Sequence, residues 1–176
     1  MSHRPIIDAG PGLKFFSIHK ERLLIGTLGP LCAPELVRDE ILRKAKADSR
    51  FAAQTVWAKV PERRLQVLPD DETADLAAVV HRISRLPMNE RMQQRADLGE
   101  TMVIAHAVVA AEAGEDVTVL IDDGRGAQVA TLEINRLLRR RARGNDIGTL
   151  RLVRTLTVLE RATGSQHLPD KRALWS

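Results

Sequence analysis

The feature that most limits what this chain can fold into is the run VTVLI at residues 117–121, which is nearly all apolar and rich in β-branched residues. Such a run is typical of a parallel strand that is covered on both faces. Shorter apolar runs at residues 5–8 and 31–33 predict further strands, and segments of helical composition lie between these runs. This alternation predicts an α/β fold, a three-layer α/β/α sandwich with a central parallel sheet.

The remaining elements follow from hydrophobic spacing and from turn residues. Residues 98–113 predict a strong helix, because apolar residues recur there at helical spacing until Gly114. We interpret the chain as one domain, residues 1–176, with a helical insertion at about 70–96 whose charged part lies on the surface. The other predicted helices cover 13–28 (with a break near His19), 34–47, 51–60, 73–85, 124–143 and 149–162, and the other predicted strands cover 65–68 and 147–148.

Composition narrows the classes of function. A chain of 176 residues with 44% hydrophobic and 28% charged residues is neither disordered nor collagen-like. Its single cysteine, Cys32, excludes internal disulfides and a cysteine-based zinc site, and it fits a cytoplasmic protein. No segment approaches the roughly 18 uninterrupted apolar residues of a membrane span. The net charge of +4 is compatible with an anionic partner, but the absence of Tyr disfavours an aromatic platform for single-stranded nucleic acid.

Acidic residues directly follow two of the predicted strands. Asp8 ends the first apolar run, and Asp122 and Asp123 end the run at 117–121. Because the carboxyl ends of parallel strands meet at one edge of the sheet, both strands deliver carboxylates to that edge. Ligands and chemistry collect there in sheets of this kind, so these acids are the first candidates for a functional site.

Further acids lie on predicted helices. Asp97 and Glu100 open the helix at 98–113, and their spacing of three residues puts both on one side of it. Glu40 lies in the helix at 34–47 beside its apolar stripe, so its charge borders the core. These helices therefore add candidate carboxylates to those at the strand ends.

Carboxylates that converge on one pocket repel one another, and burial increases this repulsion. A divalent cation removes the conflict, and Mg²⁺ and Mn²⁺ prefer oxygen ligands and retain waters, which suits phosphate chemistry. The metal activates a water and offsets the charge that builds on a phosphodiester during hydrolysis. The acids therefore favour a metal-dependent hydrolase that acts on nucleic acid.

Most of these acids also have a purely structural interpretation. Asp97 and Glu100 form the D-x-x-E pattern of a capping box, which needs no metal. Asp123 is placed to cap the helix that follows it, and Asp122 to hydrogen-bond within the same turn. Glu40 fits a solvated charge on the flank of its helix.

The structural interpretation is weakest for Asp8, because the next helix can begin at Gly10 or Pro11 without it. Another hypothesis makes Asp8 the nucleophile of a phosphohydrolase on a doubly wound sheet. That chemistry generally requires an acid at position 10, where this chain has Gly10.

A cluster of arginines ends the helix predicted at 124–143. These residues complement the negative end of the helix dipole, and they are also candidates for contacts with the phosphates of a nucleic acid. The cluster consists of Arg139, Arg140, Arg141 and Arg143.

The order of the short motifs, over about residues 4–165, resembles that of the PIN-domain nucleases, in particular the branch with a GE helix and an IDD strand end. The motifs are IIDA at 6–9, APELVRDEI at 33–41, DLGE at 97–100, LIDD at 120–123 and IGTL at 147–150. The resemblance implies a compact α/β/α fold. It also implies Mg²⁺- or Mn²⁺-dependent cleavage of RNA that leaves a 5′-phosphate and a 3′-hydroxyl.

The resemblance also assigns residues by position. It implies that the catalytic acids are Asp8, Glu40, Glu100 and Asp123, with Asp122 as an additional metal ligand. The secondary candidates are Asp97 and Thr149, the latter falling where the family has a helix-opening Gly-Thr.

Many bacterial members of this family are VapC-type toxins, which a small cognate antitoxin neutralises, and they are often dimers. The resemblance therefore implies an antitoxin and a second copy of the chain as partners, besides RNA. Apolar positions on the helices at 13–28 and 34–47 are candidates for the dimer face.

The chain departs from the family pattern at three places. Gly10 stands where the family often has Ser, Thr or Asn near the metal, the third acid is Glu100 where Asp is usual, and the segment 70–96 is longer than a minimal domain needs. Gly10 favours an alternative function, a PIN-like protein that binds nucleic acid or a protein partner without cutting.

Overall fold

A five-stranded parallel sheet forms the centre of the computed structural model, which describes residues 2–48, 52–122 and 124–163. Its strand order is β3-β2-β1-β4-β5, and every pair of neighbours is parallel. The strands are β1 (Ile6–Ile7), β2 (Leu31–Pro34), β3 (Leu65–Leu68), β4 (Val117–Leu120) and β5 (Leu150–Val153). The central strands β1 and β2 are buried throughout, which accounts for their continuous apolar character.

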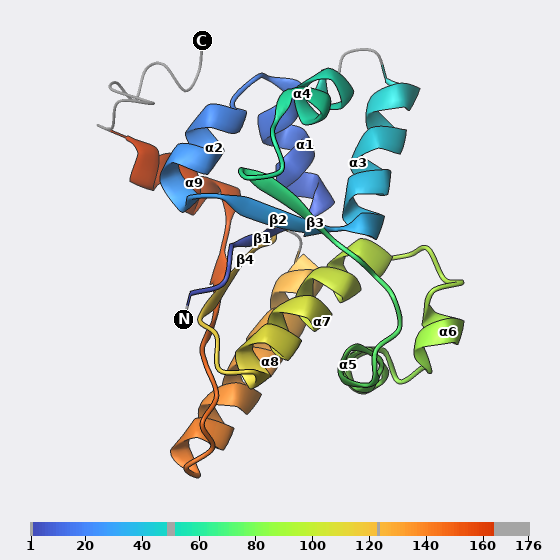
Figure 1. Ribbon diagram of the computed structural model, residues 1–176, viewed down its shortest axis with the longest axis vertical. Helices are drawn as coiled ribbons and strands as arrows, with labels where there is room; N and C mark the ends of the chain where they lie inside the picture. Colours follow the sequence, from blue (N-terminus) through green and yellow to red (C-terminus); the bar gives the residue numbers. More distant parts are fainter. Residues whose placement is uncertain (1, 49–51, 123, 164–176) are drawn as a thin grey trace.

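Helices cover both faces of this sheet and confirm the predicted three-layer α/β/α sandwich. Figure 1 shows α1, α2, α4 and α9 on one side and α5, α7 and α8 on the other, while α3 contacts α1 and α7. The helices are α1 (Ala9–Ser17), α2 (Glu21–Leu28), α3 (Glu35–Ala47), α4 (Ala53–Lys59), α5 (Ala74–Ser84), α6 (Met88–Arg91), α7 (Leu98–Glu112), α8 (Gly124–Ala142) and α9 (Thr155–Ala162). Among these helices, none is both long enough and apolar enough to cross a membrane.

Helix α7 is the most deeply buried helix, with 11 of its 15 residues buried. The sequence predicts a helix here, but one with a single apolar stripe. In the structure α7 packs against the sheet, α3, α5 and α8, so it needs apolar residues on nearly all sides. Small residues such as Ala105 and Ala107, both fully buried, allow these neighbours to approach closely.

The segment 70–96, predicted as a helical insertion, contains α5 and α6. Helix α5 packs its buried residues Leu76, Val79 and Val80 toward α7. The charged part at 87–95 is less superficial than expected, because Met88 and Arg91 of α6 are both buried. This segment therefore contributes to the layer that covers one face of the sheet.

The C-terminal part of the sheet differs from the prediction. The expected strand at 147–148 and helix at 149–162 are wrong, because the last strand is β5 (Leu150–Val153) and the helix, α9, begins only at Thr155. Parallel pairing with β4, which aligns Val117 with Leu150, extends the chain at this point. Just before β5 the chain passes close to the Glu115 backbone. A side chain on Gly148 would clash there, since its Cβ would lie 1.9 Å from the Glu115 carbonyl oxygen.

The expected dimer face on the N-terminal helices is used inside the chain. Phe16, Leu24, Val37 and Ile41 are all fully buried in the core. Only Ile18, at the end of α1, is a large hydrophobic residue exposed on these helices. These four of the apolar positions that we expected at an interface between copies are therefore core positions.

A network of ion pairs joins α5, α7 and α8 away from the acidic edge. The buried Glu133 of α8 accepts hydrogen bonds from Arg82 of α5 at 3.0 Å and from Arg136 at 2.8 Å. Glu112, at the end of α7, pairs with Arg136 at 2.5 Å and with Arg140 at 2.7 Å. These paired charges are less screened than isolated surface pairs, so the network holds the three helices together.

We predict that Glu133→Gln lowers the free energy of unfolding by about 1–3 kcal/mol, because it removes the charge that two guanidinium groups share in a partly buried setting. Urea denaturation of both proteins at pH 7 measures this difference. Glu160→Gln, on the exposed face of α9, is the matched control and should change stability by less than about 0.5 kcal/mol. Equal stability of the two variants would contradict a clamping role for Glu133.

Candidate functional site

The strand order creates a site between β1 and β4. The chain extends the sheet from β1 through β2 to β3 on one side, and from β4 to β5 on the other. In sheets of this kind, ligands bind outside the carboxyl ends of the strands at the point where the order reverses. Asp8 directly follows β1, and Asp122 lies two residues after β4, so these two of the predicted strand-end acids lie at this edge.

Asp8 is buried and also begins α1. Its backbone N–H donates to the Leu120 carbonyl at 3.1 Å, and its Oδ2 accepts a hydrogen bond from the Gly10 N–H at 3.4 Å. The expectation that the next helix begins without Asp8 is therefore wrong, because Asp8 is its N-cap. This capping hydrogen bond fixes the direction of the carboxylate, and it involves Oδ2 but not Oδ1.

Glu40 of α3 and Asp8 face the same point on α7. That point is Gly99, where a Cβ would lie 3.0 Å from Glu40 Oε2 and 3.7 Å from Asp8 Oδ1. The lack of a side chain at Gly99 allows α7 to approach both carboxylates. The interpretation of Glu40 as only a solvated flank charge does not describe this position, although its Oε1 also pairs with Lys44 at 2.5 Å.

Burial raises the pKa of the Asp8 carboxyl to about 6, and the negative charge of Glu40 adds to this effect. The N–H groups of Ala9 and Gly10 and the charge of Lys44 act in the opposite direction but do not cancel it. The ionised form of Asp8 is thus destabilised in the folded chain. A bound cation would relieve this destabilisation.

Asp122 is held by other protein groups. Its carboxylate accepts from Lys14 Nζ at 2.6 Å, from the Thr155 N–H at 2.7 Å and from Thr155 Oγ1 at 2.6 Å. Burial opposes ionisation of Asp122, but the bonds from Lys14 and Thr155 outweigh it and lower its pKa. Since both oxygens are engaged, we place Asp122 outside the proposed metal ligands and assign it to anchoring α1 and α9.

Thr149 does not open a helix, and it lies at the opposite end of β5 from the acids. Its N–H and Oγ1 both donate to Asp116 Oδ1, at 3.0 and 2.5 Å. Thr155 instead occupies the helix-opening position beside the site. The sequence carries the signal for Thr155, because this threonine follows the apolar run LRLV, which we had expected to be helical.

Glu100 points from α7 toward the start of α8. A Cβ on Gly126 would lie 2.7 Å from Glu100 Oε2, so this glycine leaves the space that the carboxylate occupies. The capping-box interpretation of Asp97 and Glu100 is wrong. Asp97 has a left-handed backbone with φ of 53°, its side chain makes no cap, and it pairs with Arg125 at 3.1 Å.

The described acids line one pocket of about 510 Å³ together with basic residues. The acids that line it are Asp8, Glu40, Asp97, Glu100 and Asp122, and the basic residues are Lys14, Arg43, Lys44 and Arg95. We did not expect any of these four cations at the site from the sequence. Their spacing offers a partial signal, since Arg43 and Lys44 follow Glu40 by three and four residues on one helix.

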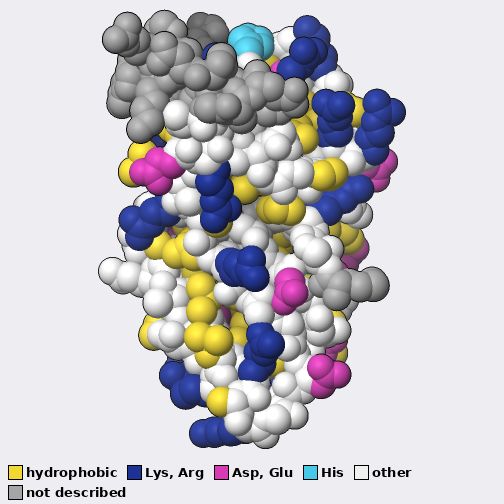
Figure 2. Space-filling view, turned by 90° about the vertical axis from the view of Figure 1, so that its left-hand side faces the viewer, with side chains coloured by type: hydrophobic (Ala, Val, Ile, Leu, Met, Phe, Trp, Pro, Cys, Tyr) yellow, Lys and Arg dark blue, Asp and Glu magenta, His cyan; other side chains and the backbone are white. Residues whose placement is uncertain are grey.

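The arginine cluster predicted to contact nucleic acid lies elsewhere. The cluster lies at the C-terminal end of α8, a helix of 19 residues that is about 28 Å long and whose other end is the one near the acidic edge. Within the cluster, Arg140 forms an ion pair with Glu112. On the face shown in Figure 2, Lys and Arg side chains are dispersed among hydrophobic ones instead of forming one patch. The structure therefore does not bring Arg139, Arg140, Arg141 or Arg143 to the acidic pocket.

The described carboxylates supply at most part of the ligand set expected for Mg²⁺. Within the described residues, no three acidic, histidine or cysteine side chains are grouped to hold a metal by themselves. Asp123, the fourth acid that we expected, lies outside the described residues. Mg²⁺ is commonly bound by one or two carboxylates together with substrate phosphates, and Asp8 and Glu40 provide such a pair.

Comparisons of the chain with protein-family models, with curated proteins and with solved structures found no match. The similarity to PIN-domain nucleases thus rests on the short motifs in the sequence and stays a prediction.

We predict that Asp8→Asn stabilises the metal-free protein at pH 7 by roughly 2 kcal/mol, because Asn retains the cap and removes a buried charge. The Asp8 pKa is raised from 3.8 to about 6, so its contribution to stability is full below about pH 4 and is lost as the pH rises through 6. Urea denaturation in EDTA should show the difference between the two proteins growing from pH 4 to pH 7. A variant less stable than the wild type at pH 7 would contradict this account.

Proposed function

We propose that this chain is a metal-dependent endoribonuclease that hydrolyses phosphodiester bonds of RNA. The observation that carries the proposal is the convergence of Asp8, Glu40 and Glu100 on one pocket bordered by cations. A carboxylate cluster alone suits a cation, and cations alone suit any polyanion. Their combination suits a phosphodiester that is bound and cleaved at the same place.

In this proposal Asp8 and Glu40 hold Mg²⁺ or Mn²⁺, and Glu100 orients groups on the other side of the pocket. Asp123 belongs to the proposed set through the resemblance to PIN-domain nucleases. When bound, the cation supplies Lewis-acid stabilisation of the phosphate and an activated water. The chain's own carboxylates accept protons and fix the cation, and the burial of Asp8 limits its competing contacts with solvent.

The basic residues of the pocket have different tasks. Lys44 pairs with Glu40 and Lys14 with Asp122, so these lysines position acids. Arg43 and Arg95 are the remaining cations that line the pocket. We assign to these two arginines the contacts with RNA phosphates, because a guanidinium binds phosphate oxygens in pairs.

The resemblance to PIN-domain nucleases adds a cellular role and partners to the proposal. It favours the toxin of a toxin–antitoxin pair, with a small cognate antitoxin that enters the acidic pocket, a homodimer and a cytoplasmic location. These parts of the proposal rest on the motif order, and a small open reading frame directly upstream would support them.

A second candidate function is a PIN-like protein that binds RNA or a protein partner without cutting. Two observations favour it: both oxygens of Asp122 are bound by protein groups, and Gly10 provides no side-chain oxygen near Asp8. Tight RNA binding with no cleavage under any divalent ion would select this function.

We predict that millimolar Mn²⁺ raises the melting temperature of the wild type, because a cation relieves the repulsion between Asp8 and Glu40. Thermal denaturation with Mn²⁺ and with EDTA measures the shift. Asp8→Asn should abolish most of it, whereas Glu160→Gln, which does not line the pocket, should retain it. An equal shift in Asp8→Asn would place the cation elsewhere.

We also predict Mn²⁺-dependent cleavage of a mixed-sequence RNA that Asp8→Asn and Glu40→Gln each reduce by about a hundredfold or more. Gel analysis of end-labelled RNA measures the rate, and circular dichroism checks that the variants are folded. Glu160→Gln serves again as the control with unchanged rate.

Cleavage by Asp8→Asn at the wild-type rate, or cleavage in EDTA, would overturn the proposed mechanism. Hydrolysis of small phosphate monoesters with no cleavage of RNA would instead support the phosphohydrolase with Asp8 as nucleophile.

A further inference from the structure

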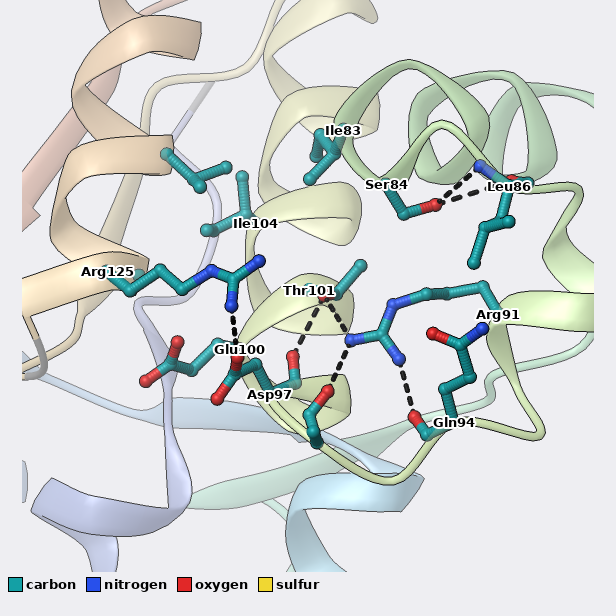
Figure 3. Close-up of a pocket in the computed structure, with 13 residues that line it drawn as sticks. Ile83, Ser84, Leu86, Arg91, Gln94, Asp97, Glu100, Thr101, Ile104 and Arg125 are labelled. Atoms are coloured by element: carbon teal, nitrogen blue, oxygen red, sulfur yellow. Dashed lines mark hydrogen bonds and ion pairs between the residues drawn. The ribbon is translucent and has the colours of Figure 1, made fainter.

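A second hollow, of about 220 Å³, adjoins the acidic pocket. It lies between α5, α7, α8 and the loop before α7, as Figure 3 shows. Asp97 and Glu100 line both spaces, so they form a common wall. The two spaces therefore lie side by side, on either side of these two carboxylates.

The size and walls of the hollow suit a single ring system. Apolar side chains reach it from three helices, with Ile83 from α5, Ile104 from α7 and Val129 from α8. Its volume is below the roughly 300–1,000 Å³ of pockets that hold larger ligands. One planar base between aliphatic walls fits these properties better than a whole nucleotide.

Arg91 gives the hollow a buried hydrogen-bond donor. This residue is 6% exposed, and its guanidinium donates to the carbonyls of Gln94 and Ala96 at 2.5 and 2.8 Å and to Thr101 Oγ1 at 3.0 Å. These acceptors are all neutral, and the ion pairs found in the described part of the chain do not include Arg91. A guanidinium has five N–H groups and three of them make these bonds, so Nε–H and one N–H of Nη1 are left for a ligand.

The side of the hollow nearest the acidic pocket carries opposite charges. Asp97 and Arg125 pair there at 3.1 Å, and the Arg125 side chain is 77% exposed. Guanidinium planes stack on unpaired bases, and a carboxylate accepts hydrogen bonds from the N–H groups of a base edge. Arg125 and Asp97 thus provide contacts that complement the apolar walls.

We propose that this hollow binds one base of the RNA, guanine in preference to the others, next to the phosphate held in the acidic pocket. Guanine presents two acceptors, O6 and N7, that arginine binds, and its N–H groups match the Asp97 carboxylate. The inference rests on the proposed function, since it names the part of the substrate that the same site selects.

Binding of mononucleotides in EDTA tests this inference without cleavage. Guanosine, adenosine, cytidine and uridine 5′-monophosphates are titrated into the methyl-labelled protein and followed by NMR. We expect guanosine monophosphate to shift the methyl signals of Ile83, Ile104 and Val129 and to bind about tenfold more tightly than the other three.

A matched pair of variants on α8 tests whether guanosine monophosphate binds in the hollow. Val129→Phe fills the hollow and should weaken binding of guanosine monophosphate by about tenfold or more. Leu132→Phe adds the same ring at a position that is 67% exposed on the same helix, and it should bind like the wild type. Equal weakening in both variants would contradict binding in the hollow.

RNA cleavage provides the second arm of the test. The wild type should cut preferentially beside guanine, and Val129→Phe should lose this preference while still cutting in Mn²⁺. If no mononucleotide shifts these methyl signals, or if all four bind equally, the inference is overturned even when the protein cuts RNA. Guanine-selective binding by a protein that cuts no RNA would support the base site and overturn only the nuclease.

Discussion

The candidate site depends on how closely two helices approach a buried edge of the sheet. At Gly99 the first turn of α7 lies against Asp8 and Glu40, and at Gly126 the start of α8 lies against Glu100. A Cβ at Gly126 would lie 2.7 Å from Glu100 Oε2 and one at Gly99 would lie 3.0 Å from Glu40 Oε2, so a larger residue at either position would push a carboxylate aside. The acids therefore converge because two positions on neighbouring helices carry no side chain.

The central part of the fold could be predicted from the sequence because burial dictates the residues of its strands. Runs such as 117–121 are continuous apolar strands because helices cover both faces, and their alternation with helices implies parallel pairing. The last strand, β5, was missed because its exposed Arg151 interrupts the apolar pattern. Its identity comes from pairing with β4, a long-range contact that local spacing does not encode.

The site could be predicted in part. Position after a buried strand correctly placed Asp8 at the sheet edge, and Glu40 and Glu100 line the same pocket. Local sequence patterns did not reveal which acids are already bound by protein groups. The hydrogen bonds from Thr155 to Asp122 join residues 33 positions apart, so only the folded structure shows them. The same holds for Arg95, which lines the pocket from the loop that Arg91 links to α7.

The placement of Asp8 beside Glu40 has a consequence for the lifetime of the protein in the cell. A fold weakened by its own ionised acids opens more often, and degradation acts on opened molecules. A divalent ion that neutralised the pair would lengthen the lifetime of the chain. Under the proposed function, the abundance of this protein in the cell would therefore rise and fall with the supply of that ion.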